Sequence, residues 1–589
     1  MDGTLTPPAW RPVPIASAMR RVLARGYTAR DFLADVTSGV LVGIVALPLS
    51  MALAIAVGVP PQHGLYTAIV AGAVVALLGG CKFQVTGPTA AFVVILSPIA
   101  SRFGLSGLLT AGMLAGVFLI AMGLLRLGAL IRFIPYPVTT GFTAGIATVI
   151  ATLQLKDVFG LDAGKLPDHF VERASALFRA RGTARWEELA VAAGTMALLV
   201  GLPRITKRIP APLVAMTLVA GIVVLVHRVV PAFTVATIGS RFHTTIHGVV
   251  VNGIPRVLPL PSLPWGSGGL SFADLRELLS ASVAIAILGA IESLLSATIA
   301  DGMTQTRHDP DAELVALGIG NVVAPFFGGI PATGALARTA TNIRSGARSP
   351  ISAVVHSAVV LLCIVVAAPL VAYVPMASLA ALLLLVAWNM SEAHHFAGIV
   401  RVAPKSDVAV LVVCYLLTVV FDMVVAVSVG VILAAFLFIR RMSELTRSAF
   451  DVTGVGDDGE PRPLPDGVVL YEIEGPLFFG AAQTAMRGLQ GGVADRYKIL
   501  VLNLSRVSVM DATGLAALEN AIADVVRRKK RVVLVVPLGP KDVLERARLD
   551  LEYDGLLFAP DLDAGIVLAG ELVAKATPSV PVLPTQVAH

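Results

Sequence analysis

The sequence predicts a polytopic α-helical membrane protein of fourteen spans, arranged as two inverted seven-helix repeats and followed by a small cytoplasmic α/β domain. Of its 589 residues, 56% are hydrophobic and only 14% are charged, whereas soluble globular proteins carry about 25% charged residues. The mean hydropathy is +0.82. Apolar runs of membrane-spanning length recur to about residue 440, after which the composition becomes that of a soluble domain.

Fourteen apolar segments account for the predicted spans, since a crossing takes about 20 residues. The uninterrupted ones are 36–57, 64–80, 106–125, 128–153, 189–202, 211–229, 277–300, 312–328, 351–372, 376–390, 407–421 and 423–439. Two more, 87–100 and 331–343, are shorter and are broken by Gly and Pro. An even number of crossings places both termini on the same side of the membrane.

Loop charges predict the orientation of these spans. If the N-terminus is cytoplasmic, the short outside loops 59–63, 328–330 and 374–375 carry no Lys or Arg. The inside segments carry Arg20, Arg21, Arg25, Arg30, Lys82, Arg126, Arg132, Arg204, Lys207, Arg208, Arg344, Arg348, Arg401, Lys405, Arg440 and Arg441. This is the positive-inside pattern, and it predicts cytoplasmic N- and C-termini. The net charge of +6 then reports loop topology, so we expect no nucleic-acid partner.

The two broken segments predict a ligand site at mid-membrane. Each is the third of seven spans, and a repeat with an odd number of spans inserts its second copy in the opposite orientation. Broken helices at matching positions of inverted repeats meet near the bilayer centre in transporters. A pair of merely kinked helices is the alternative, because Gly and Pro are common in membrane helices.

Half-helices that begin at mid-membrane predict anion binding, because helix N-termini present unpaired N–H groups and a partial positive charge. Small residues there let a ligand approach the backbone. Arg338, one turn further on, would add positive charge; the alternative is a snorkelling or structurally paired arginine. The residues expected in the two first turns are Thr89, Ala90, Gly334, Ala335 and Leu336.

Glu292 is the candidate coupling residue. It has apolar or small neighbours for a full turn on either side, and Ser296 shares its helix face. A carboxylate removed from water in this way can bind and release a proton near neutral pH. The alternative is a permanent ion pair with Arg338.

No feature of the sequence predicts an enzyme, a metal site or a cofactor. Cys81, Cys363 and Cys414 lie in or beside apolar runs without metal-ligand spacing, so neither a disulfide framework nor a zinc site is supported. We find no nucleophile paired with a base and no phosphate-binding Gly loop.

The C-terminal part is predicted to be a small α/β layer domain. Strands are expected at 468–474, 498–504 and 531–536, with helices at 482–489 and 513–528. Thr513 opens the second helix and is a candidate phosphorylation site, because a helix N-terminus tolerates added negative charge; a simple N-cap at Asp511 or Thr513 is the alternative. The expected domains are a cytoplasmic segment 1–30, a membrane domain 31–443 with repeats at about 31–230 and 272–443, a linker 444–466 and the C-terminal domain 467–589.

Several motifs resemble those of SulP (solute-carrier-26) anion transporters. The matching segments are 45–52, 60–66 and 85–89 for the family's first three helices, 289–301 with Glu292 for the eighth, 327–342 for the tenth, and 509–515 for the STAS domain, which is related to anti-sigma-factor antagonists. The resemblance implies a dimer in which a core domain moves like an elevator against a gate domain. It also implies an anion between helices 3 and 10.

The resemblance adds expectations about specificity and coupling. The wall contributed by helix 1 falls on Pro48, Leu49 and Leu53, and family members often carry polar or aromatic groups at the two leucine positions. Glu292 with Ser296 resembles the proton-coupled members, whereas sodium-coupled bicarbonate carriers have Asp and Thr there. The string 387–394 is similar to that of C4-dicarboxylate (succinate-type) carriers, but it lies outside the expected site.

The sequence therefore predicts a proton-coupled secondary anion transporter of the bacterial inner membrane. Its expected partners are a small anion (a C4-dicarboxylate, sulfate or bicarbonate), a proton rather than sodium, lipid, a second copy of the chain and a regulatory protein that binds the STAS domain. An anion channel or voltage-responsive membrane motor is one alternative. A STAS-based signalling protein with a vestigial transport domain is another.

Overall fold

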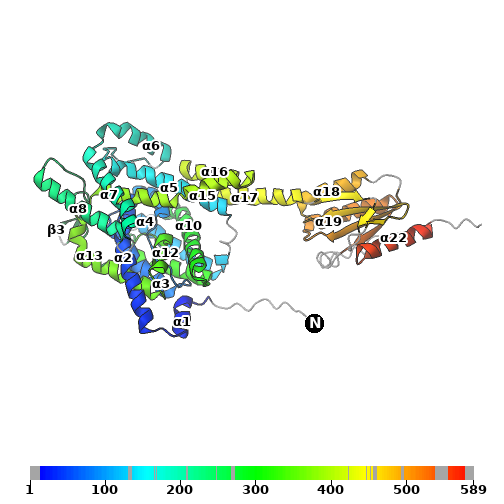
Figure 1. Cartoon of the computed structure of the whole chain (residues 1–589), viewed down its shortest axis with the longest axis horizontal. Helices are drawn as coiled ribbons and strands as arrows, with labels where there is room; N and C mark the ends of the chain where they lie inside the picture. The colour runs from blue at the N-terminus through cyan, green and yellow to red at the C-terminus, as the bar shows by residue number, and fades with distance from the viewer. Residues whose placement is uncertain are drawn as a thin grey trace, which may run out of the picture. The chain divides into compact units, whose positions relative to one another are not determined.

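Figure 1 shows the chain in a computed structural model. The residues that the structure describes are 13–129, 135–164, 166–167, 169–206, 210–246, 249–266, 272–421, 423–445, 447–451, 453–455, 461–492, 497–536 and 555–576. Parts of the predicted N-terminal segment, linker and C-terminal domain therefore lie outside the described residues. The chain forms two compact units, Met1–Ile432 and Leu433–His589.

The first unit is almost entirely helical, as the hydropathy predicts. Its helices are α1 (Ser17–Ala24), α2 (Ala29–Val57), α3 (Gln62–Leu78), α4 (Ala90–Leu124), α5 (Tyr136–Val158), α6 (Phe170–Arg179), α7 (Trp186–Ile205), α8 (Ala211–Val229), α9 (Ile238–Arg241), α10 (Phe272–Thr304), α11 (Pro310–Val323), α12 (Leu336–Arg344), α13 (Ile351–Val371), α14 (Met376–Met390), α15 (Ala393–Val402), α16 (Lys405–Val420) and α17 (Met423–Leu445), the last of which continues into the second unit.

These helices agree with the predicted fold class. Within the described residues, nine helices are long and apolar enough to cross a membrane. The break predicted between two spans near residue 105 appears inside α4, where Gly104 has a φ of 66° and divides the helix in two. Counted as two segments, α4 brings the helices into register with the predicted segments, an order consistent with fourteen crossings.

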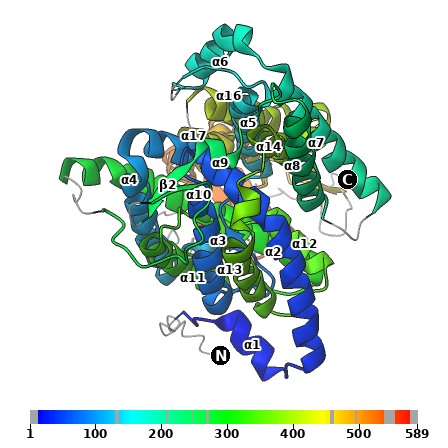
Figure 2. The same cartoon turned by 90° about the vertical axis from the view of Figure 1, so that its left-hand side faces the viewer.

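The helices pack in two groups, which Figure 2 shows one below the other. In one group, α4 packs on α10 and α11, and α13 packs on α2 and α3; in the other, α5 packs on α14 and α16, and α7 packs on α14. Close contacts occur at glycines: a Cβ on Gly39 would lie 2.6 Å from that of Val355, and one on Gly116 would lie 2.6 Å from the Gly318 carbonyl oxygen. Small residues allow such close approach between membrane helices.

Two very short strands tie the broken segments together. Strand β1 (Thr86–Gly87) pairs antiparallel with β4 (Thr333–Gly334), so that Thr86 faces Gly334. The Ala335 N–H also donates to the Val85 carbonyl at 2.9 Å. The two broken segments therefore meet, as predicted from their matching positions.

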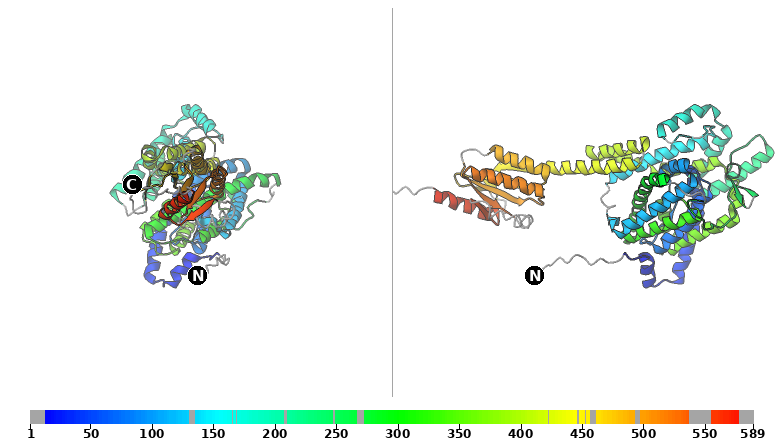
Figure 3. Two further views of the ribbon diagram at one scale, coloured as in Figure 1. Left: turned by 90° about the vertical axis from the view of Figure 1, so that its right-hand side faces the viewer. Right: turned by 180° about the vertical axis from the view of Figure 1, so that it is seen from behind.

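The second unit contains a five-stranded sheet in the order β11-β10-β9-β8-β5 (Figure 3). The parallel strands are β8 (Val468–Glu474), β9 (Ile499–Arg506), β10 (Arg531–Val535) and β11 (Leu556–Ala559), and β5 (Arg447–Asp451) is antiparallel to β8. Helices α18 (Phe479–Gly492) and α19 (Ala512–Arg527) cover one face, and α22 (Leu562–Ala576) covers the other. Strands β6 (Thr453–Val455) and β7 (Pro461–Pro463) form a separate hairpin.

The predicted strands and helices of this unit match β8, β9, β10, α18 and α19. The segment expected as a linker differs, because β5 lies within it and joins the sheet. The physical reason is that the backbone of β5 pairs with the unpaired N–H and C=O groups at the edge of β8. Charge and Gly/Pro content do not reveal such pairing.

Candidate functional site

The first broken segment begins its helix where the sequence predicts. Thr89 is the N-cap of α4, with extended backbone, and Ala90 is the first helical residue. The Thr89 hydroxyl donates a 2.8 Å hydrogen bond to Oε2 of Glu292 on α10. The hydroxyl at the start of the first half-helix is thus bound to the carboxylate predicted to couple transport.

The second broken segment begins its helix later than expected. Gly334 was expected in the first helical turn, but it belongs to β4; Ala335 is the N-cap and Leu336 is the first residue of α12. The reason is the pairing with β1, which holds the backbone extended until its ladder ends. Ala335 is buried, whereas the side chain of Leu336 is exposed.

Arg338 lies inside the protein and does not snorkel to the surface. Its exposed fraction is 2%, and its Nη2 donates a 2.6 Å hydrogen bond to the carbonyl of Pro88. In the described structure, Nε and Nη1 are buried without a hydrogen-bond partner. A buried cation with unused donors is unfavourable unless a counter-charge binds there.

The structure separates the two charged residues that the alternative interpretation pairs. Glu292 accepts from Thr89, and Arg338 donates to Pro88. The ion pairs of the described residues include none between Glu292 and Arg338. Ser296, expected beside Glu292, instead donates to Thr339 Oγ1 at 3.2 Å, and this oxygen also accepts from the Val85 N–H at 3.1 Å. Ser296 thus connects α10 to both broken segments.

The three residues expected from helix 1 lie in the second half of α2. Pro48 lies inside the continuous helix and removes one backbone donor. Pro48 and Leu53 are buried, and Leu49 is partly exposed. The helix packs on α4 and α12, which carry the two half-helix starts.

A buried polar network behind the site was missed by sequence reasoning. Glu313 on α11 is fully buried and accepts from the N–H groups of Gly80 and Cys81, both at 2.8 Å. The amide of Gln84 donates to Glu313 at 2.7 Å and to Ser293 at 2.6 Å. The available signal was a carboxylate at the start of the apolar run 312–328. A charged residue at either terminus of such a run is easily assigned to the membrane–water interface.

A second buried contact missed by sequence reasoning fixes the backbone just before β4. Asn321 on α11 accepts from the Ala332 N–H at 2.8 Å and donates to its carbonyl at 2.9 Å. The amide therefore satisfies both backbone groups of a residue that has left helical geometry at membrane depth, which membrane proteins require.

In the C-terminal unit, the N-cap of α19 is Asp511. Its carboxylate accepts from the Gly514 N–H at 2.7 Å. The Thr513 hydroxyl is not used as the cap, and its residue is exposed. The hydroxyl is thus accessible at a helix N-terminus, as a modification there requires.

The fold and the site define a polytopic membrane transporter with a C-terminal sheet domain. A model of the "Sulfate permease family" matches residues 32–414, and a model of the "STAS domain" matches residues 463–553. The chain therefore belongs to the sulfate permease (SulP) family, and it is a transporter and not an enzyme.

Known proteins agree with this assignment. Over 533 residues the chain is 40% identical to "Putative sulfate transporter YvdB" of Bacillus subtilis, covering 89% of this chain and 95% of the relative. Over 534 residues it is 31% identical to "Bicarbonate transporter BicA" of Picosynechococcus sp., covering 87% and 89%. The solved structure of SLC26A9 shares the fold, with a TM-score of 0.79, 18% identity and coverage of 94% and 93%.

Proposed function

We propose that this chain is a proton-coupled symporter of a small anion. The names of the relatives favour sulfate or bicarbonate, and a C4-dicarboxylate is the remaining candidate. The observation that carries the proposal is the buried Arg338, whose Nε and Nη1 have no hydrogen-bond partner in the described structure. An anion would supply the missing acceptors and the missing counter-charge.

The backbone around Arg338 suits the same ligand. The starts of α4 and α12 follow directly after the paired strands β1 and β4, so two helix N-termini are held near one another. Unpaired N–H groups and helix dipoles at both ends favour negative charge. Leu49, Leu53 and Pro48 from α2, together with Thr89, Ala90, Gly334, Ala335 and Leu336, are the proposed lining of the site.

Coupling is assigned to Glu292. Its hydrogen bond to Thr89 connects the carboxylate to the start of α4, so a change in its charge acts on the first half of the anion site. The proposed cycle starts with an anion that docks at Arg338 and a proton that binds Glu292. The bound proton offsets charge in the core domain and permits the core domain to slide against the gate domain. A sodium site would need several oxygen ligands, whereas a protonated carboxylate needs none.

The remaining parts of the proposal concern assembly and placement. We place the transporter in a bacterial inner membrane as a homodimer with cytoplasmic termini. We also propose four parts of the chain: segment 1–30, membrane domain 31–443, linker 444–466 and STAS domain 467–589. Phosphorylation of Thr513 would regulate a contact of the STAS domain with a partner protein.

The test is uptake of labelled sulfate, bicarbonate and succinate into proteoliposomes, with an inward proton gradient and no sodium. Accumulation of one of these anions above equilibrium is expected. Glu292→Gln should abolish accumulation because it cannot exchange a proton. Glu277→Gln, which changes an exposed acid on the same helix, serves as the control. Equilibration without accumulation would indicate a channel instead, and accumulation only with sodium would overturn the coupling assignment.

A further inference from the structure

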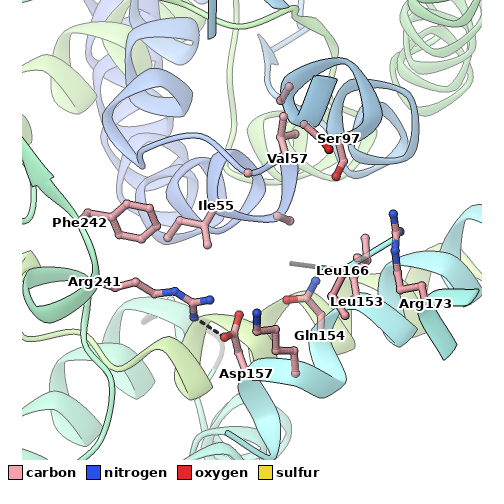
Figure 4. Close-up of a pocket in the computed structure, with 15 residues that line it drawn as sticks. Ile55, Val57, Ser97, Leu153, Gln154, Asp157, Leu166, Arg173, Arg241 and Phe242 are labelled. Carbon is pink, nitrogen blue, oxygen red and sulfur yellow. Dashed lines mark hydrogen bonds and ion pairs between the residues drawn. The ribbon is translucent and has the colours of Figure 1, made fainter. Parts of the chain in front are cut away.

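A basic cavity lies apart from the proposed transport site. It has a volume of about 390 Å³ and opens between the C-terminal part of α2, the first segment of α4, and the elements α5, α6 and α9 (Figure 4). None of its lining residues belongs to the set around Arg338 and Glu292. Since α2 enters the membrane after the basic N-terminal segment, the predicted topology places this cavity on the outer face.

Charge is concentrated in the lining. Lys156, Arg173 and Arg241 contribute three positive charges, and Asp157 contributes the one negative charge among the lining residues. Asp157 accepts from Nη1 of Arg241 at 2.5 Å, so the positive charge exceeds the negative by two within the lining. The remaining lining residues are apolar or neutral. Asp162, outside the lining, also interacts electrostatically with Lys156.

Each cation is held by its own contact. Lys156 donates from Nζ to the Gly164 carbonyl at 2.8 Å, and Arg173 donates from Nε to the Pro167 carbonyl at 3.0 Å. Arg173 is 6% exposed. Figure 4 shows Arg241 and Arg173 on opposite sides of the cavity, with Asp157 and Gln154 between them. The two arginines therefore flank the space at opposite ends (Figure 4).

We propose that this cavity is a second anion site, an outer recruiting site that binds a small oxyanion such as sulfate before it reaches the core. Surfaces lined by one sign of charge raise the local concentration of the opposite ion and its rate of arrival. The volume exceeds that of a water molecule, about 30 Å³, by more than tenfold, so a hydrated oxyanion fits. That the cavity recruits anions for transport rests on the proposed transport function. That the cavity binds an anion does not.

A reporter cysteine at Ser101 tests the site without transport. Ser101 lines the cavity and is exposed, and Cys363→Ser removes the native cysteine that is not buried. In purified Ser101→Cys protein, an anionic thiol reagent should react faster than a cationic one of similar size. Arg241→Gln or Lys156→Gln should slow the anionic reagent about threefold, the effect of one charge at roughly 7 Å in water. Asp157→Asn should accelerate it.

Sulfate protection supplies the binding measurement. Sulfate should slow modification of Ser101→Cys more than a chloride solution of equal ionic strength does, and Arg241→Gln should weaken this protection. Arg228→Gln, which changes an exposed arginine at the end of α8 outside the cavity, should have no effect.

Ser97→Cys is the second reporter if Ser101→Cys does not fold. Reaction rates that ignore the charge variants, or equal protection by chloride, would overturn the proposal. Protection by sulfate in a protein that accumulates no anion would support the site while refuting the transport function.

Discussion

The two broken segments share a backbone plan but differ in their chemistry. Each passes from a two-residue strand into a helix, and the two strands pair with one another. The first continues into the segment of α4 that precedes Gly104, with a hydroxyl at its start, whereas the second continues into the nine-residue α12 with a buried arginine. Pseudo-symmetry thus supplies two similar helix starts, and side chains make one neutral and the other positive.

The two charged side chains that contact the broken segments, Glu292 and Arg338, both come from the second repeat. Glu292 on α10 accepts from Thr89, 203 residues earlier, and Arg338 on α12 donates to Pro88, 250 residues earlier. The first repeat offers only a hydroxyl and a carbonyl in return. Because the carboxylate and the guanidinium have different partners, we expect that the proposed proton coupling and the proposed anion affinity can be changed separately.

Arg338→Gln should have the largest effect on the positive half. It removes the cation, and hydrogen bonds to charged groups contribute about 1.5–3 kcal/mol each. We expect anion affinity to fall about 10- to 100-fold, measured as the Kd of the purified protein. Arg344→Gln, an exposed arginine in the last turn of the same helix, is the control. Unchanged affinity would leave Arg338 with a structural role only.

Gly87→Ala and Gly334→Ala should distinguish the contributions of the two strands. A Cβ on Gly87 would lie 2.3 Å from Nη1 of Arg338, and one on Gly334 would lie 2.5 Å from the amide nitrogen of Gln84. Overpacking of this kind costs about 1–3 kcal/mol. Gly87→Ala should lower anion affinity about tenfold, because the guanidinium moves. Gly334→Ala should chiefly lower the Tm, because Gln84 leaves its partners. Equal losses of affinity in both variants would contradict this division.

Thr89→Val should have the smallest effect, on the neutral half. It removes the donor to Glu292 but keeps the carboxylate, and a typical hydrogen bond contributes about 0.5–1.5 kcal/mol. We expect proton-driven uptake to persist at a rate about 2- to 10-fold lower. Thr89→Ser, which keeps the hydroxyl, should restore the rate. Complete loss of proton dependence in Thr89→Val would mean that the hydroxyl takes part in coupling directly.

The second unit shows the limit of composition as a guide to boundaries. Alternation of apolar residues predicts β8, and short runs rich in β-forming residues predict β9 and β10, so each strand carries a local signal of its own. Strand β5 lies in a charged segment, and its place at the sheet edge depends on pairing with β8. Edge strands tolerate charge, so their sequences resemble those of linkers.

The sequence by itself determined the order of the membrane segments, the positions of the two breaks and the residue types at Thr89, Glu292 and Arg338. A bilayer imposes these patterns locally, because each span must be apolar and each intramembrane charge is costly. Only the tertiary structure decided that Glu292 bonds to Thr89 and not to Arg338. It also decided that α12 begins at Leu336. These outcomes depend on contacts between residues more than 200 positions apart, and no local pattern encodes which distant groups meet.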